Sequence, residues 1–310
     1  MSGKQAKSVE SPFSPPKLAY VELLSTCNAN CKHCTVPKND RVFGVTRNMD
    51  QLCEDFQTLR NLGVEAVTLA GGEPTLHPNF VEVVGEAHDK FKKVHVISNG
   101  SNPSLLRAIT NDAEVWVSLD YMGSSHSIHR GIDGLWQKYL SICNIVNVRC
   151  TLFRDNLSDI QQIILYAGLD NKQKITIAPY RGFNLSLCPM PQMIRELFTF
   201  IHNYDLQKNV IIDDCSTRQY VANGLGIKKF VGCNAVTGII RVTYSGMVTP
   251  CPFLSTEITS LHDPFLKDKL IDARQDITKI TPSKCAVCPY QLTCGGCKAS
   301  LNSHCIFSSI

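Results

Sequence analysis

Three cysteines stand close together in the stretch Cys27-Asn-Ala-Asn-Cys31-Lys-His-Cys34. They follow an apolar run, 18–24, which predicts a buried strand, so the thiols are expected on the loop that leaves the C-terminal end of that strand. Three thiolates can bind a [4Fe–4S] cube and leave its fourth iron with an open position, where a ligand could bind and be reduced. A zinc site or a group of core thiols is the alternative.

The loop resembles the hallmark of the radical S-adenosylmethionine (radical SAM) superfamily, a Cys-x3-Cys-x2-Cys loop after the first strand of a barrel. His33 holds the place of an aromatic residue that lies near the adenine in that family. The resemblance implies a [4Fe–4S] cluster on Cys27, Cys31 and Cys34, with S-adenosylmethionine bound at the open iron. An electron from the cluster would cleave the sulfonium to a 5′-deoxyadenosyl radical, while the protein supplies orientation and excludes water.

Composition sets the class of protein. A chain of 310 residues is long for one domain and predicts a barrel with a small appendage. The net charge of +4 is too slight to indicate nucleic acid, and no apolar run is long enough to span a membrane. The 15 cysteines, without an apolar signal sequence, predict metal ligands in a reducing cytoplasm. Residues 1–16, rich in Ser, Pro and Lys, are expected to form a disordered leader.

Short apolar strands alternate with helix-period segments through most of the chain, which is typical of a parallel sheet. The predicted strands are 18–24, 66–70, 93–98, 114–119, 147–152 and 174–178. The predicted helices are 49–59, 80–91, 105–109, 135–143, 157–167 and 193–204. Six such units wound in one direction give an α/β fold, a partial (β/α)6 TIM-like barrel predicted over 17–228.

A glycine turn ends the second predicted strand. Its residues, Gly71-Gly72-Glu73-Pro74, match the Gly-Gly-Glu-Pro motif of the radical SAM family. Two glycines let the backbone come close to a ligand, and an acidic group suits the cationic amino group of the cofactor. Taken alone, the motif could equally be an ordinary turn.

Further polar residues end the next strands. Asn99 after the third strand, and Ser118 and Asp120 at the end of the fourth, also resemble family elements, with Ser118 placed to meet the ribose. Alternation along the fifth strand directs Arg149 into the lumen, as a candidate for the cofactor carboxylate. The alternative is a structural ion pair of Arg149 with Glu22 or Asp120.

A second group of cysteines lies near the C-terminal end and resembles the SPASM domain of many radical SAM enzymes, predicted here over 229–310. It comprises Cys233, Cys251, Cys285, Cys288, Cys294, Cys297 and Cys305, with a hairpin expected over 238–250. The resemblance implies an outer auxiliary cluster on Cys285, Cys288, Cys294 and Cys305. An inner cluster on Cys233, Cys251 and Cys297 would lack a fourth cysteine. A zinc ribbon is the alternative.

Five cysteines remain. Cys53, Cys143 and Cys150 fall on apolar faces and are predicted to be core residues. Cys188 and Cys215 follow the sixth predicted strand, near the expected mouth of the barrel. Either thiol could donate a hydrogen atom to a substrate radical or ligate iron; a structural role is the alternative.

These observations together predict a cytoplasmic radical enzyme that abstracts a hydrogen atom from its substrate. Family members with such a tail most often crosslink, epimerise or oxidise peptides and proteins, so a peptide substrate is the leading hypothesis. A small molecule such as a sugar, aminoglycoside or tetrapyrrole is the second, because the barrel begins without a preceding peptide-binding module. A non-catalytic iron–sulfur or zinc protein is the third. The expected partner is an electron donor such as flavodoxin or ferredoxin, with neither nucleic acid nor membrane.

Overall fold

One sheet runs through the centre of the molecule. The computed structural model describes residues 14–34, 36–170, 173–181, 184–213, 233–280 and 297–298. The strands are β1 (Leu18–Glu22), β2 (Ala66–Ala70), β3 (Lys93–Ser98), β4 (Glu114–Ser118), β5 (Asn147–Leu152), β6 (Ile175–Pro179), β7 (Val210–Ile212), β8 (Ile239–Val242), β9 (Met247–Thr249) and β10 (Thr259–Ser260). Their order is β10-β9-β8-β1-β2-β3-β4-β5-β6-β7. Strands β1 to β8 pair in parallel, whereas β9 pairs with β8, and β10 with β9, in antiparallel fashion.

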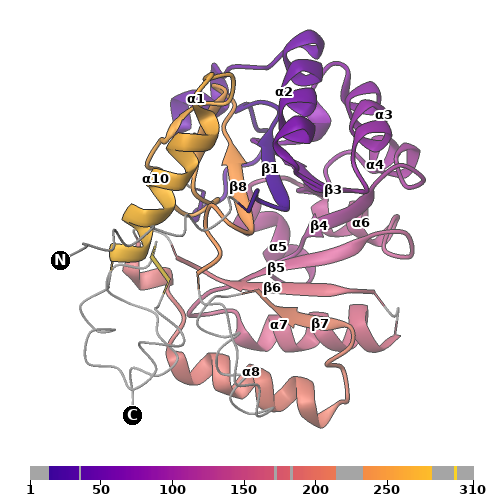
Figure 1. The fold of residues 1–310 in the computed structure, drawn as a ribbon. Coiled ribbons are helices and arrows are strands. Elements are labelled where there is room, and N and C mark those ends of the chain that lie inside the picture. Colours follow the sequence, from indigo (N-terminus) through magenta and orange to yellow (C-terminus); the bar gives the residue numbers. More distant parts are fainter. Residues whose placement is uncertain are drawn as a thin grey trace, which may run out of the picture.

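Helices cover the outside of this sheet (Figure 1). They are α1 (Lys38–Val42), α2 (Met49–Leu62), α3 (Phe80–Lys90), α4 (Pro103–Ala108), α5 (Gly123–Arg130), α6 (Leu135–Leu140), α7 (Leu157–Ile163), α8 (Pro191–Asn203) and α10 (Leu266–Lys279). A π-helix, η2 (Ile164–Asp170), continues α7, and single 3-10 turns lie at η1 (Pro74–Leu76) and η3 (Leu185–Leu187). The alternation of parallel strands and helices confirms the predicted α/β class with a partial barrel.

The core lies between the strands and the helices. In β5, Val148, Cys150 and Leu152 are fully buried, whereas Arg149 is half-buried, as the alternation along the strand predicts. In helix α2, too, the apolar residues at helical spacing are buried. A capping box between Asn48 and Gln51 closes the N-terminus of this helix. Each predicted strand and helix is present, with bounds that differ by a few residues.

The sheet is wider than predicted. Strand β7 adds to β6 in parallel, and β8 adds to β1 in parallel on the other side. The prediction of six strands was therefore too low. The sequence-based prediction missed β7 because three apolar residues are too few to indicate a strand. It placed β8 in a hairpin but not beside β1, because the pairing of β8 with β1 is a long-range contact. The hairpin of β8 and β9 is confirmed. The division into domains at residue 229 stays a prediction.

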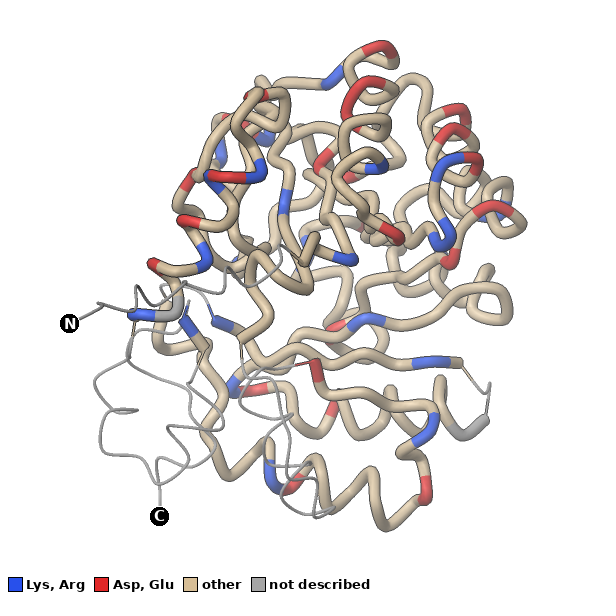
Figure 2. The backbone as a smooth tube through the Cα atoms, in the orientation of Figure 1, with Lys and Arg blue, Asp and Glu red and all other residues tan. Residues whose placement is uncertain are grey.

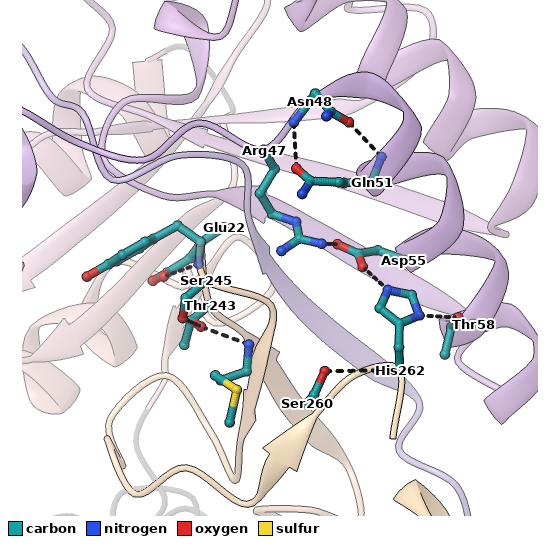
Figure 3. A network of polar contacts seen from close by, with 12 residues as sticks. Glu22, Arg47, Asn48, Gln51, Asp55, Thr58, Thr243, Ser245, Ser260 and His262 are labelled. Carbon is teal, nitrogen blue, oxygen red and sulfur yellow. Dashed lines mark hydrogen bonds and ion pairs between the residues drawn. The ribbon is translucent and has the colours of Figure 1, made fainter. Parts of the chain in front are cut away.

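A polar junction ties this hairpin and the segment after it to α2 (Figure 3). The buried carboxylate of Asp55 pairs with Arg47 Nη2 at 2.7 Å and with His262 Nε2 at 2.8 Å. Gly246 turns the hairpin with a φ of +79°, and a Cβ there would lie 2.7 Å from Arg47 Nη1, so the guanidinium packs against the turn. The junction fixes the hairpin that leads to Cys251 relative to the barrel.

The surface carries both signs of charge. Basic and acidic residues are interspersed along the helices in Figure 2, in keeping with the small net charge of +4. Among the helices that the structure describes, none has both the length and the apolar character that crossing a bilayer requires.

Candidate iron–sulfur and cofactor site

The three-cysteine loop leaves β1 at its C-terminal end, as predicted. Cys27 and Cys31 are half-buried, Cys34 is exposed, and all three are free thiols. Burial raises the pKa of Cys27 to about 11, and the nearby negative charges of Glu73, Cys31 and Cys34 also raise it. All three sulfurs stand on this one loop between Cys27 and Cys34. Three free thiols on one loop are a donor set that fits a [4Fe–4S] cluster.

The glycine turn after β2 lies directly against this loop. Gly72 N donates to the carbonyl of Leu24 over 2.7 Å, and Glu73 N donates to that of Thr26 over 2.9 Å. A Cβ on Gly72 would lie 2.0 Å from Thr26 O, and one on Gly71, whose φ is +139°, would lie 2.3 Å from Leu24 O. The glycines are thus required for close packing of the turn on the backbone that precedes Cys27.

Glu73 is a buried organising residue, only 1% exposed. Its Oε1 accepts hydrogen bonds from Thr75 N at 3.2 Å, Thr75 Oγ1 at 2.6 Å and Ser98 Oγ at 2.7 Å, and its Oε2 accepts from Asn99 N at 2.7 Å. Burial raises the pKa of Glu73, and these donors counteract that shift. The carboxylate thus links the ends of β2 and β3; contact with the cofactor amino group stays a prediction.

Asn99 connects that arrangement to the cysteine loop. Its Nδ2 donates to Asn28 Oδ1 over 2.8 Å, and its Oδ1 accepts from Ser101 N over 2.8 Å. Asn28 lies between the first two cysteines, so the end of β3 positions the loop. Its predicted contact with the cofactor stays untested.

A buried ion pair lies beside the cysteine loop. Arg130 Nη2 donates to Asp120 Oδ2 over 2.5 Å, and Asp120 Oδ1 accepts from Thr151 N over 2.7 Å. Burial favours a raised pKa for Asp120, but the charge of Arg130, the two nearby histidines and the hydrogen bond from Thr151 N together outweigh it, so the pKa lies below its usual range. Arg130 Nη1 also points at Cys31 Sγ, 3.8 Å away. Asp120 was predicted at this site, whereas Arg130 was missed.

A group of aromatic rings lies beside the ion pair. His33 stacks on His129 with ring centroids 5.1 Å apart, and His33 Nδ1 lies 2.9 Å from His129 Nε2. Phe153 and Tyr121 contact His129 from two further strand ends. Burial lowers the pKa of His33 to about 4, so its ring is neutral near pH 7. The predicted flat ring at position 33 is thus part of a stack, while its place beside an adenine stays a prediction.

Three of these residues also present ligand atoms close together. One donor atom each from His33, Asp120 and His129 lies within 4.8 Å of the others. The two imidazoles already hydrogen-bond each other, and Asp120 already pairs with Arg130. A metal ion at this point would have to displace both interactions, so the cysteine loop is the better metal site.

Ser118 and Arg149 lie side by side in the register of β4 and β5. Both are half-buried. The structural partners considered for Arg149 are taken by other arginines, since Glu22 pairs with Arg241 at 2.8 Å and Asp120 with Arg130. Arg149 therefore remains the candidate for a cofactor carboxylate, and Ser118 the candidate for the ribose.

The cysteines outside the loop have different surroundings. Cys150 is fully buried and its core prediction is confirmed. Cys143 is half-buried and packs against the core, and Cys53 is half-buried on α2, so neither is the fully buried core residue that was predicted. Cys188 is 1% exposed and packs against Phe153 and Tyr180, next to the aromatic rings of the site. The other candidate donor and the outer-cluster cysteines lie outside the described residues: Cys215, Cys285, Cys288, Cys294 and Cys305.

The predicted inner-cluster cysteines are described, and all three are half-buried. Cys233 and Cys251 both pack against the edge of the core. Their segments run together, because Val236 N donates to Pro250 O over 3.1 Å. Cys297 Sγ accepts a hydrogen bond from Arg181 Nη1 over 2.8 Å. Ligation of a cluster by these thiols stays a prediction.

A strand–helix barrel with three free thiols on the loop after β1 has the donor set of an iron–sulfur protein. Residues 21–149 match the family model of the radical SAM superfamily. It is 31% identical over 164 residues to the antilisterial bacteriocin subtilosin biosynthesis protein AlbA of Bacillus subtilis, covering 49% of this chain and 36% of AlbA. It is 23% identical over 327 residues to the AdoMet-dependent heme synthase of Methanosarcina barkeri, covering 92% of this chain and 91% of that protein.

Solved structures support the fold. The structure of Streptococcus suis SuiB bound to S-adenosylmethionine superposes with a TM-score of 0.70 at 18% identity, over 92% of this chain and 74% of SuiB. SuiB bound to its precursor peptide SuiA gives a TM-score of 0.71 at 16% identity, over 92% of this chain and 72% of SuiB. The shared fold extends beyond the barrel into the C-terminal part of the chain.

Proposed function

We propose that the protein is a radical SAM enzyme that modifies a peptide or protein by crosslinking, epimerisation or oxidation. The observation that carries this proposal is the group of three free thiols, Cys27, Cys31 and Cys34, packed between the Glu73 turn and the Arg130 guanidinium. When bound, the cluster supplies an electron and S-adenosylmethionine supplies the 5′-deoxyadenosyl radical that abstracts a substrate hydrogen. A flavodoxin or ferredoxin would deliver the electron, in a reducing cytoplasm that keeps the thiols free.

The residues of the chain position the reactants. Cys27, Cys31 and Cys34 would hold the cluster at the end of β1. Arg130 would not bind the cluster itself but orients Cys31 through its contact with the sulfur. Arg149 offers a positive charge for a carboxylate, and Ser118 beside it offers a hydroxyl. The stacked rings of His33 and His129 wall one side and exclude water from it. Auxiliary clusters on the C-terminal cysteines would accept or relay an electron.

The proposal of a peptide substrate rests on similarity to two proteins. AlbA takes part in bacteriocin biosynthesis, and SuiB binds a precursor peptide. The test is transfer of deuterium into 5′-deoxyadenosine from fully deuterated peptides encoded by genes beside this one. We expect labelled 5′-deoxyadenosine and a mass change in one peptide, whereas label from none of them would contradict a peptide substrate.

A tetrapyrrole is the second candidate substrate. The match to the heme synthase spans 92% of this chain and 91% of that protein, so the likeness is not confined to the barrel. A deuterated iron tetrapyrrole in the same assay separates the two proposals, because only the true substrate passes deuterium to 5′-deoxyadenosine.

A further inference from the structure

Arg181 lies where the barrel meets the C-terminal cysteines. It follows the end of β6, and its Nη1 donates to Cys297 Sγ over 2.8 Å. Its guanidinium also lies over the ring of Phe253, with 5.4 Å from Cζ to the ring centroid. Phe253 comes two residues after Cys251. One arginine on the barrel therefore reaches both cysteine-bearing segments.

Cys251 lies near backbone N–H groups, the Arg181 guanidinium and Cys297. Burial raises the pKa of Cys251, and the backbone N–H groups of Phe253 and Leu254 and the charge of Arg181 offset that rise only in part. Amide and guanidinium groups directed at sulfur are the contacts that stabilise metal-bound thiolates. Cys251 and Cys297 thus share one polar environment, with Arg181 beside both.

We propose that Arg181 is a positioning residue of the inner auxiliary centre, where it holds Cys297 beside Cys251 and raises the reduction potential of a cluster bound there. The inference rests on the proposed function, which supplies the cluster on Cys233, Cys251 and Cys297. A hydrogen bond to a ligand sulfur and a nearby positive charge both stabilise the reduced, more negative cluster. Phe253 holds the guanidinium in place through its ring face.

The geometry differs from that at the barrel loop. Arg130 lies 3.8 Å from Cys31 Sγ and shares its charge with the buried carboxylate of Asp120. Arg181 lies 2.8 Å from Cys297 Sγ. The shorter contact makes Arg181 the stronger influence on its cysteine, so removing it should change the inner cluster without changing the barrel loop.

The test uses the full chain with Cys27, Cys31 and Cys34 all replaced by alanine, so that only auxiliary clusters are loaded. Redox titration followed by electron paramagnetic resonance gives their potentials, and the signal lost in Cys251→Ala identifies the inner cluster. At the potential where half of the unmodified inner cluster is reduced, Arg181→Gln should lower the ratio of reduced to oxidised cluster about tenfold. This corresponds to a fall in the midpoint reduction potential of about 59 mV for one electron. The control is Arg107→Gln, an exposed arginine on α4 bonded to Ser141 O, which should change nothing.

Each outcome decides the proposal. If Arg181→Gln abolishes the resonance of the inner cluster while the metal-free protein unfolds as the unmodified one does, that result supports the role of Arg181 in holding Cys297. The reduction potential is then measured in Arg181→Lys, which keeps the positive charge. A potential for Arg181→Gln equal to that of Arg107→Gln would overturn the proposal. So would the absence of any signal that depends on Cys251. Formation of 5′-deoxyadenosine by the unmodified protein is measured separately, so failure of the proposed function is distinguishable.

Discussion

The buried pair of Asp120 and Arg130 gives the sharpest prediction on stability. Asp120 is 0% exposed and Arg130 is 6% exposed, so Asp120→Asn would leave a guanidinium charge in the interior without its partner. Removing one partner of a buried pair costs about 3–5 kcal/mol. We expect the lower end, about 3 kcal/mol, because the amide oxygen of asparagine can still accept from Thr151 N.

Urea unfolding of the metal-free protein measures this cost without any contribution from bound clusters. Glu65→Gln is the matched control, since Glu65 pairs with Lys17 and Lys92 at the surface, where solvent screens the charges. Replacing both partners, Asp120→Asn with Arg130→Met, should recover part of the loss because no buried charge remains. If Asp120→Asn cost no more than Glu65→Gln, the buried charge would not be stabilising the structure beside the cysteine loop.

Three further changes test other parts of the structure. Gly72→Ala should prevent loading of a cluster on Cys27, Cys31 and Cys34 and so lower the iron content, because its Cβ would lie 2.0 Å from the backbone before Cys27. Gly85→Ala, with open space around it, should load normally. Asp55→Asn should cost about 3 kcal/mol in urea unfolding, because Arg47 would lose its partner in the junction to the hairpin. Burial lowers the pKa of His126 to about 3, so the unfolded chain binds more protons and stability falls as the pH drops from about 6.5 towards 3. His126→Asn should flatten that fall by up to about 1.4 kcal/mol per pH unit.

Each of these predictions has a contradicting result. Normal iron content in Gly72→Ala would mean that the turn does not have to pack on the cysteine loop. An Asp55→Asn protein as stable as the unmodified chain would mean that the junction contributes no stability. An unchanged acid slope in His126→Asn would mean that this histidine does not stay neutral in the folded protein.

The parts of the site that the sequence predicts are those with strong local signals. The cysteine spacing located the loop after β1 that is the candidate metal site, and Gly71-Gly72-Glu73-Pro74 located the turn packed against it. The strands were predictable because β1 to β6 are short apolar runs with buried faces. What the sequence could not give is the partner of each polar group, such as the four hydrogen bonds that engage Glu73.

Helix α5 shows why Arg130 was missed. The helix directs its polar residues inward, so that His126, His129 and Arg130 are buried while Ile128 is 75% exposed. Apolar periodicity cannot reveal such a helix, because the pattern is reversed. The signal available was the spacing of the three basic residues at i, i+3 and i+4, which places them on one face.

The central claim is that the loop of Cys27, Cys31 and Cys34 enables the protein to cleave S-adenosylmethionine. Its most direct test is the yield of 5′-deoxyadenosine from anaerobically reconstituted, reduced protein, compared between the unmodified chain and the variant with all three cysteines replaced by alanine. The double variant Cys53→Ala, Cys143→Ala is the control for loss of half-buried thiols elsewhere. The account predicts that the unmodified and control proteins form 5′-deoxyadenosine and that the triple variant forms none, while still binding iron through its C-terminal cysteines. Continued formation of 5′-deoxyadenosine by the triple variant would contradict it.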